Sequence, residues 1–156
     1  ADLSDYVYWG DKPQISGTRN VGWLSADHSF PQAEPLSSDL DVIWEYCKVR
    51  VYQTRGLHAC PFCEGWFEKK LLRIRHRGEM MNQGDAEILI VSEEHGAFAA
   101  PNLIFHYMRD HHYSPPDPFL MALRSVEPNP GQAYRQQLDD AGIYWSKYWK
   151  ICPEDL

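Results

Sequence analysis

The segment Leu57-His-Ala-Cys-Pro-Phe-Cys-Glu-Gly65 places two cysteines, Cys60 and Cys63, in a C-x-x-C turn. Such a turn presents two thiolates from one tight loop, which is half of a tetrahedral zinc site. A second pair of ligands follows in Phe105-His-Tyr-Met-Arg-Asp-His-His112, where His106 and His111 have the H-x4-H spacing of zinc fingers. The sequence therefore predicts zinc as cofactor, with Cys60, Cys63, His106 and His111 as its ligands.

A regular helix would not bring both histidines to one ion. Residues five positions apart are separated by about 140° around a straight helix. Either the helix loosens near Asp110, or another histidine replaces one of the pair, with His58 the first reserve and His112 the second. Asp110 follows His106 by one turn and is expected to orient its ring. The alternative interpretation is that the thiols are only buried and the histidines favour a helix C-terminus.

The pattern around these residues predicts the fold class. Residues 72–77 alternate with period two, and residues 86–91 form an apolar run, so we expect an antiparallel hairpin with a long loop at 78–84. Ala100-Pro-Asn102 then opens the helix that carries the histidines. Cysteine knuckle, hairpin and helix follow one another as in treble-clef zinc modules. We predict an α+β fold with a small antiparallel sheet and several helices, as a single domain over 1–156 with the zinc module at 57–112.

The other expected elements follow from apolar spacing and turn residues. Trp145, Tyr148 and Trp149 have the spacing of one helix face, which we expect to pack on the protein's own core. Cys47 lies on the apolar stripe of an earlier helix and is predicted to be a buried thiol, whereas Cys152 receives no role. The remaining predictions are short strands and loops over 1–35, a strand over 96–99, and helices from Ser37 or Ser38 to about Arg50, from Asp117-Pro118 to about 127, and over 131–141.

Three motifs resemble those of a family of small bacterial proteins without an assigned activity. They are H-x-C-P-F-C from His58, A-A-P-x-L-I-x-H-Y from Ala99, and H-x-Y-x-P-P from His111. In that family the residue before the first helical histidine is usually tyrosine, where this chain has Phe105. A catalytic role of that hydroxyl would therefore not carry over to this protein.

Composition and charge limit the functional classes. The 156 residues are 44% hydrophobic and 24% charged, as in an ordinary globular domain. The formal charge of −7 is the sum of −6 over residues 1–46, +5 over 47–80 and −6 over 81–156. General nucleic-acid binding needs a basic face, which only the middle third offers. No apolar run reaches the roughly 20 residues that cross a bilayer, and a signal-peptide pattern is lacking, so we expect a cytoplasmic protein with no membrane partner.

The sequence favours a non-enzymatic, zinc-stabilised protein that binds a macromolecular partner. Two cysteines and two histidines close the coordination sphere of zinc, and closed sites are structural. The acidic charge predicts a basic protein partner, contacted through Asp5, Asp11 and Asp27. Small acidic proteins of this kind are often immunity proteins that cover a basic toxin, which is an argument by association only.

Two alternatives remain open. A zinc-dependent hydrolase would need an open ligand position and assistance from Glu64, Asp110 or His112, although no H-E-x-x-H motif is present. A nucleic-acid-binding module would use the basic strip 66–77, in which Arg73, Arg75 and Arg77 share one face of the expected strand. The simpler interpretation of the strip is a solvated outer face.

Overall fold

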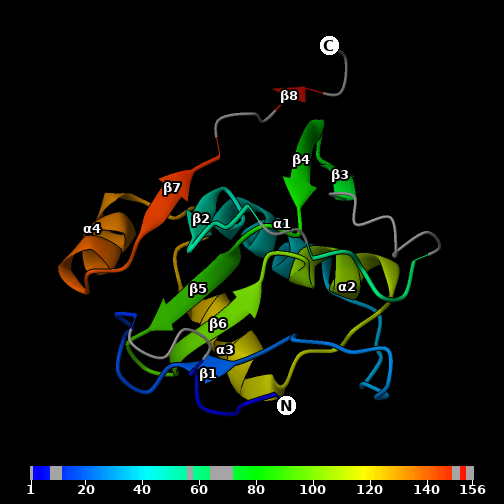
Figure 1. The fold of residues 1–156 in the computed structure, drawn as a ribbon, viewed down its shortest axis with the longest axis horizontal. Helices are drawn as coiled ribbons and strands as arrows, with labels where there is room; N and C mark the ends of the chain where they lie inside the picture. The colour runs from blue at the N-terminus through cyan, green and yellow to red at the C-terminus, as the bar shows by residue number, and fades with distance from the viewer. Residues whose placement is uncertain (1, 8–11, 56–57, 64–71, 149–151, 154–156) are drawn as a thin grey trace.

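The computed structural model describes residues 2–7, 12–55, 58–63, 72–148 and 152–153, and its fold is α+β, as predicted (Figure 1). The helices in this part of the chain are α1 (Ser37–Tyr46), α2 (Ile104–Asp110), α3 (Asp117–Ser125) and α4 (Gln132–Asp140). The strands are β1 (Arg19–Asn20), β2 (Val49–Val51), β3 (Leu72–His76), β4 (Glu79–Gln83), β5 (Glu87–Ser92), β6 (Gly96–Pro101), β7 (Trp145–Lys147) and β8 (Cys152–Pro153). No described helix is long and apolar enough to cross a membrane.

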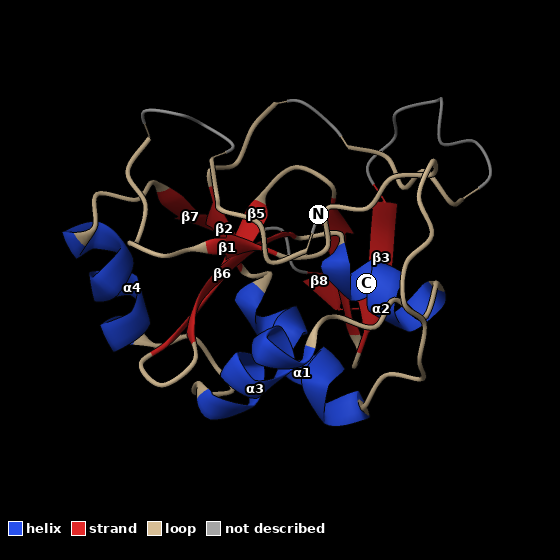
Figure 2. Ribbon diagram, turned by 90° about the horizontal axis from the view of Figure 1, so that it is seen from below, coloured by secondary structure: helices blue, strands red, loops and turns tan. Residues whose placement is uncertain are grey.

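A five-stranded sheet in the order β1-β6-β5-β2-β7 forms the centre of the molecule. The pair β1 and β6 is parallel, and the other pairs are antiparallel. Successive residues of β5 point to opposite faces: Ile88 and Ile90 enter the larger hydrophobic cluster, and Leu89 enters a second one. Helices α1 and α3 lie together on one side of this sheet (Figure 2). Because both faces are covered, β5 is an almost continuous apolar run.

The prediction of a hairpin between residues 72–77 and 86–91 is wrong. Strand β3 pairs instead with β4 in a separate three-stranded sheet, β3-β4-β8, while β5 pairs with β6 and β2. Between His76 and Glu79, which face each other, the chain turns through Arg77 and Gly78, both with positive φ (51° and 73°). A two-residue turn of this kind matches the twist of paired strands and closes the hairpin at once. Two hairpins in two sheets thus separate the cysteines from α2, and a treble-clef core is not shown.

Helix α1 ends four residues before the expected boundary near Arg50. Its C-cap is Cys47, and Val49–Val51 forms β2, with all three side chains buried. The β-branched valines suit a strand that is covered on both sides. Lys48 and Arg50 therefore lie beyond the end of the helix. The prediction that Cys47 is buried is confirmed.

The aromatic stripe near the C-terminus is not a helix where it is described. Residues 145–147 form β7, which pairs with β2, and residues 149–151 lie outside the described part of the chain. The predicted helices over 117–127 and 131–141 are confirmed as α3 and α4, and Gly142 follows α4 with a φ of 72°. Pro101 ends β6 and does not open α2, which begins at Ile104.

Candidate metal centre

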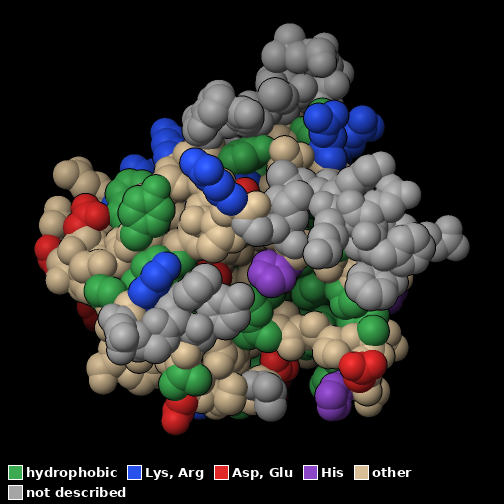
Figure 3. Space-filling view, viewed as in Figure 1, with side chains coloured by type: hydrophobic (Ala, Val, Ile, Leu, Met, Phe, Trp, Pro, Cys, Tyr) green, Lys and Arg blue, Asp and Glu red, His purple; other side chains and the backbone are tan. Residues whose placement is uncertain are grey.

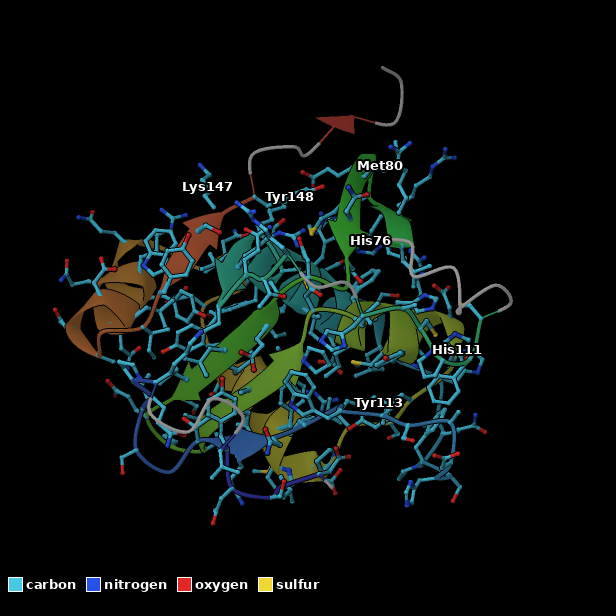
Figure 4. All side chains as sticks on the ribbon, in the orientation of Figure 1. His76, Met80, His111, Tyr113, Lys147 and Tyr148 are labelled. Atoms are coloured by element: carbon cyan, nitrogen blue, oxygen red, sulfur yellow. The ribbon has the colours of Figure 1, made fainter. Side chains whose placement is uncertain are left out.

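Four predicted ligand residues meet in one place. One ligand atom from each of Cys60, Cys63, His106 and His111 lies within 4.8 Å of the other three. Cys60 is buried, His106 is 5% exposed, and the other two are partly buried. The group lies between the 58–63 loop and the C-terminal end of α2, where Figure 4 labels His111. A set of two thiols and two imidazoles can hold a metal ion of the transition series.

The cysteine loop is held in place by backbone and ring contacts. The His58 N–H donates to the Gly84 carbonyl at 2.7 Å, which fastens the start of the loop ahead of β5. The Phe62 N–H points at Cys60 Sγ at 3.4 Å. The Phe62 ring packs edge-on against Tyr107 and lies 5.4 Å from the His111 ring. These contacts fix the loop over α2.

The end of α2 resolves the angular problem posed by the histidine spacing. His111 is the C-cap, with φ −116° and ψ 6°, outside helical geometry. This departure after Asp110 corresponds to the loosened helix, the first of the two alternatives that the sequence left open. It brings His111 Nε2 to 3.1 Å from His106 Nε2, although a straight helix would direct the two rings apart.

Hydrogen bonding among the four side chains does not account for their approach. His111 Nε2 lies 3.3 Å from Cys60 Sγ, 3.4 Å from Cys63 Sγ and 3.1 Å from His106 Nε2. His106 Nε2 is in turn 3.2 Å from Cys63 Sγ. A ring nitrogen offers either one N–H or one lone pair, so it cannot satisfy three close neighbours. A cation at the common centre would satisfy all four ligands together.

Asp110 orients the His106 ring, as the sequence predicted. Asp110 Oδ2 lies 2.8 Å from His106 Nδ1. The Arg109 side chain donates to both carboxylate oxygens of Asp110 at 3.0 Å, and it also donates to the Arg75 carbonyl on β3. An imidazole that donates its Nδ1–H to a carboxylate presents the lone pair of Nε2 to a metal. Sequence reasoning missed Arg109, whose only signal was its position beside Asp110.

Burial sets the protonation of these groups. It lowers the pKa of His106 and outweighs the opposing Asp110 carboxylate. Burial also lowers the pKa of His111. Both shifts favour the neutral, metal-binding imidazole. Burial raises the pKa of the Cys60 thiol to about 11, so a thiolate there needs a cation beside it.

The reserve ligands lie outside this group. His58 is exposed, two residues before Cys60. His112 has a φ of 57°, its side chain is 53% exposed, and it lies 4.0 Å from the Glu34 carboxylate. Of the residues expected to assist a hydrolase, Asp110 is bonded to His106 and Arg109, and Glu64 lies outside the described residues.

The basic strip is exposed along β3. Arg73 and Arg75 face solvent on either side of the buried Ile74, and Arg77 follows in the turn, 3.5 Å from Asp41. Figure 3 shows Lys and Arg side chains gathered over the β3–β4 hairpin. Residues 66–71, the rest of the expected strip, are not described. The predicted partner residues Asp5 and Asp27 are exposed, whereas Asp11 lies outside the described residues.

Comparisons with known proteins give one match. Neither a curated protein nor a solved structure matches the chain. A family model described as "Domain of unknown function (DUF7919)" matches residues 1–124. This range includes Cys60, Cys63, His106 and His111, and it ends within α3, so α4 and β7 lie beyond it. Because the match covers well over half of the 156 residues, the chain belongs to the DUF7919 family.

Proposed function

We propose that Cys60, Cys63, His106 and His111 bind one zinc ion in a closed, structural site. The observation that carries this proposal is the convergence of their four ligand atoms. Zinc binds thiolate at about 2.3 Å and imidazole at about 2.0–2.1 Å, so a tetrahedral site has ligand–ligand distances of roughly 3.3–3.8 Å. Four of the six distances between these ligand atoms are 3.1–3.4 Å, close to that range, and all six are within 4.8 Å. Mixed sulfur and nitrogen ligands favour zinc over magnesium or calcium.

A zinc ion at this position would join two parts of the fold that the backbone does not join directly. Cys60 and Cys63 belong to the 58–63 loop, whereas His106 and His111 belong to α2 and its C-cap. Because the ligands converge only in the folded chain, the free energy of binding zinc becomes free energy of folding. Four protein ligands fill a tetrahedral zinc ion, which is why we assign the site a structural and not a catalytic role.

Metal analysis tests this proposal. Purified protein should contain about one zinc per chain. Replacing zinc with Co²⁺ should give the visible absorption of a tetrahedral thiolate site, and the absorption should be lost in Cys63→Ser. A metal-free protein whose two thiols react freely, and whose melting does not change with chelator, would refute the site.

We further propose that the protein is a cytoplasmic, non-enzymatic binding protein with a basic macromolecular partner, of the immunity type. Support comes from the charge of −7 and from exposed Asp5 and Asp27. Several other acidic residues of the first 46 are engaged within the fold: Asp2 with Tyr113, Asp39 with Arg124, Asp41 with His76, and Glu45 with Lys48. The surface available to a partner is therefore smaller than the charge of residues 1–46 suggests.

A pull-down from the native cell at low and high salt tests this second proposal. We expect a basic protein that is recovered at low salt and lost at high salt, with weaker recovery by the Asp5→Lys, Asp27→Lys double variant. Recovery of nucleic acid, lost when Arg73 and Arg75 are replaced, would instead support the basic strip. Recovery of nothing at any salt would count against a binding protein and favour the hydrolase alternative.

A further inference from the structure

A groove of about 760 Å³ lies apart from the metal centre, where the turn between β5 and β6 meets the C-terminal end of α3 and the start of α4 (Figure 2). Its described lining comes from residues 91–94, from residues between 125 and 137, and from Tyr46 of α1. The volume is within the usual range for ligand sites, about 300–1,000 Å³. The groove is therefore large enough to take up several side chains of a bound molecule.

The groove carries negative charge that the fold leaves unpaired. Glu93, Glu94 and Glu127 line it and are exposed, and no Lys or Arg is among its described lining residues. Glu93 and Glu127 form no side-chain hydrogen bond or ion pair with other described residues. The Glu94 carboxylate lies 3.7 Å from His95, and its side chain is 82% exposed. The carboxylates of Glu93 and Glu127 are therefore available to a cation from outside the protein.

Hydrogen bonds hold the segments around the groove in place. Ser92 Oγ lies 2.7 Å from Ser125 Oγ, which joins the end of β5 to the end of α3. The His95 N–H donates to Ser92 Oγ at 3.1 Å and so fixes the turn between β5 and β6. The Tyr46 hydroxyl donates to the Glu127 carbonyl at 3.0 Å. The backbone that carries the carboxylates is thus ordered before a ligand binds, which lowers the entropic cost of binding.

Two tyrosines add aromatic surface to the lining. The rings of Tyr46 and Tyr134 pack edge to face, with their centroids 5.0 Å apart. The Tyr134 hydroxyl donates to the Leu89 carbonyl at 2.6 Å, so both hydroxyl hydrogens are used within the protein. The tyrosines therefore offer a ligand their apolar ring atoms. Long basic side chains lay their methylene groups on such surface while their charged ends reach polar groups beyond it.

We propose that this groove takes up an extended basic segment of the macromolecular partner, whose Arg or Lys side chains pair with Glu93 and Glu127. The inference rests on the proposed function and adds the place where the basic partner docks. Charge complementarity selects the occupant, because carboxylates without a cation of their own attract a positively charged segment. A groove also shields such pairs from water better than an open surface does, and each pair is stronger there. The metal ligands take no part in this contact.

A short peptide with two arginines, acetyl-Gly-Arg-Arg-Gly-amide, is a suitable probe. The same peptide with citrulline in place of arginine is its neutral match in shape. At about 0.15 M salt, charges more than about 8 Å apart are largely screened, so only local pairs count. We expect saturable binding of the arginine peptide, with amide chemical-shift changes concentrated at residues 91–95 and 125–137. The citrulline peptide should bind about tenfold more weakly, the order expected for the loss of two partly exposed ion pairs.

Matched variants separate the groove from the net charge. The double variant Glu93→Gln, Glu127→Gln should bind the arginine peptide about tenfold more weakly. The double variant Asp27→Asn, Glu34→Gln removes the same charge at exposed positions outside the groove. It should keep the peptide affinity within about twofold, because those charges are screened. All four side chains are exposed, so both variants should fold, which circular dichroism checks.

Four results would overturn the proposal: no saturable binding of the arginine peptide, equal binding of the citrulline peptide, equal losses in the two double variants, or shift changes confined to other surfaces. The pull-down distinguishes this failure from that of the proposed function. If the groove variant recovers as much basic protein as the unaltered protein, the groove is wrong and the proposed function stands. If the unaltered protein recovers no basic protein, the proposed function fails, and the peptide titration alone decides whether the groove takes up a basic segment.

Discussion

At the scale of single residues, the backbone at the C-terminal end of α2 determines which histidine faces the two cysteines. His111 and His112 are neighbours, yet only His111 turns its ring toward the two cysteines, and His112 lies beside Glu34. The backbone separates them: His111 has φ −116°, and His112 has φ 57°. Two adjacent imidazoles thus serve different purposes, and they provide a matched pair for experiment.

His111→Asn is expected to lower zinc content and thermal stability, because one of four ligands is lost and the remaining three hold the ion less well. The same change at His112 should have little effect, because asparagine tolerates a positive φ and the His112 side chain is mostly solvated. Zinc analysis and melting curves of the two variants measure the difference. Equal losses in both would exclude His111 as a specific ligand.

Asp110→Asn should weaken zinc binding by roughly 10- to 100-fold, the usual cost of losing the carboxylate behind a ligating histidine. Its physical basis is the 2.8 Å contact between Asp110 and His106 Nδ1. Competition with a chromophoric chelator gives the affinity. Asp140→Asn, at the last residue of α4, is the control and should bind zinc as tightly as the unaltered protein. Unchanged affinity in Asp110→Asn would mean that the ring needs no such support.

The sequence predicted contacts between individual residues best where the two residues are close in the chain. Asp110 is one helical turn from His106, and a loosened helix end was one of two alternatives that followed from the five-residue spacing of the histidines. Contacts between remote segments were not predictable. The bond from Arg109 to the Arg75 carbonyl joins residues 34 positions apart, and Asp39 pairs with Arg124 across 85.

At the scale of elements, Glu79 joins β4 to α1. Its carboxylate accepts Lys48 Nζ at 3.0 Å and Trp44 Nε1 at 3.1 Å. Burial raises the pKa of Glu79, but these hydrogen bonds and the Lys48 charge outweigh it and hold the pKa below its ordinary value. The stabilisation from a depressed carboxylate pKa is present above the unfolded-state pKa and is lost as the pH falls through the folded-state value.

Glu79→Gln should therefore lower the free energy of unfolding at pH 7 by up to about 1 kcal/mol, with the difference shrinking as the pH falls below about 4. Glutamine still accepts from Trp44 but loses the charge that holds Lys48. Denaturant titrations at several pH values measure the effect. Glu94→Gln, whose carboxylate is 82% exposed, is the control and should keep the pH dependence of the unaltered protein. A constant difference at every pH would contradict the ionic explanation.

Tyr148 joins β2, β4 and the C-terminal segment. Its hydroxyl accepts the Asn82 N–H at 3.0 Å, and the Arg50 guanidinium lies 4.0 Å from its ring centre. Tyr148→Ala should destabilise the protein by about 2 kcal/mol, because it removes a cation–π contact and a hydrogen bond together. Tyr144→Ala, at a side chain 62% exposed, should stay within about 0.5 kcal/mol. Equal effects would show that Tyr148 is no more important than a surface residue.

Helices were more predictable than strand partners. The starts of α1 and α3 and the whole of α4 follow from local apolar spacing and from the residues at their ends. Strand pairing depends on segments that are distant in the chain. Val49–Val51 forms β2 because it pairs with β5 on one side and with β7 on the other. Residues 145–147 were predicted to be helical, but they form the strand β7 and pair with β2. The valines of β2 favour a strand locally, but nothing in the local sequence identifies the partners of either strand.

At the scale of the whole molecule, a structural metal should make unfolding depend on free zinc. Binding to the folded state alone stabilises it by about 2.7 kcal/mol when free zinc is 100 times the dissociation constant. Chelator should therefore lower the melting temperature of the whole transition, and added zinc should restore it. Melting followed by circular dichroism and by aromatic fluorescence measures this effect. A chelator-insensitive midpoint would show that the fold does not depend on the ion.

The loop that begins at His58 serves two neighbours at once. His58 lines a cavity of about 240 Å³ and is bonded to Gly84, and Cys60 is two residues further on; Asn102 lines the same cavity, four residues before His106. An ion that joins Cys60 to His106 would therefore link two segments that each form part of the wall of this cavity. If the ion changes the affinity of the cavity for any molecule, thermodynamic reciprocity requires that molecule to change the affinity for the ion by the same factor.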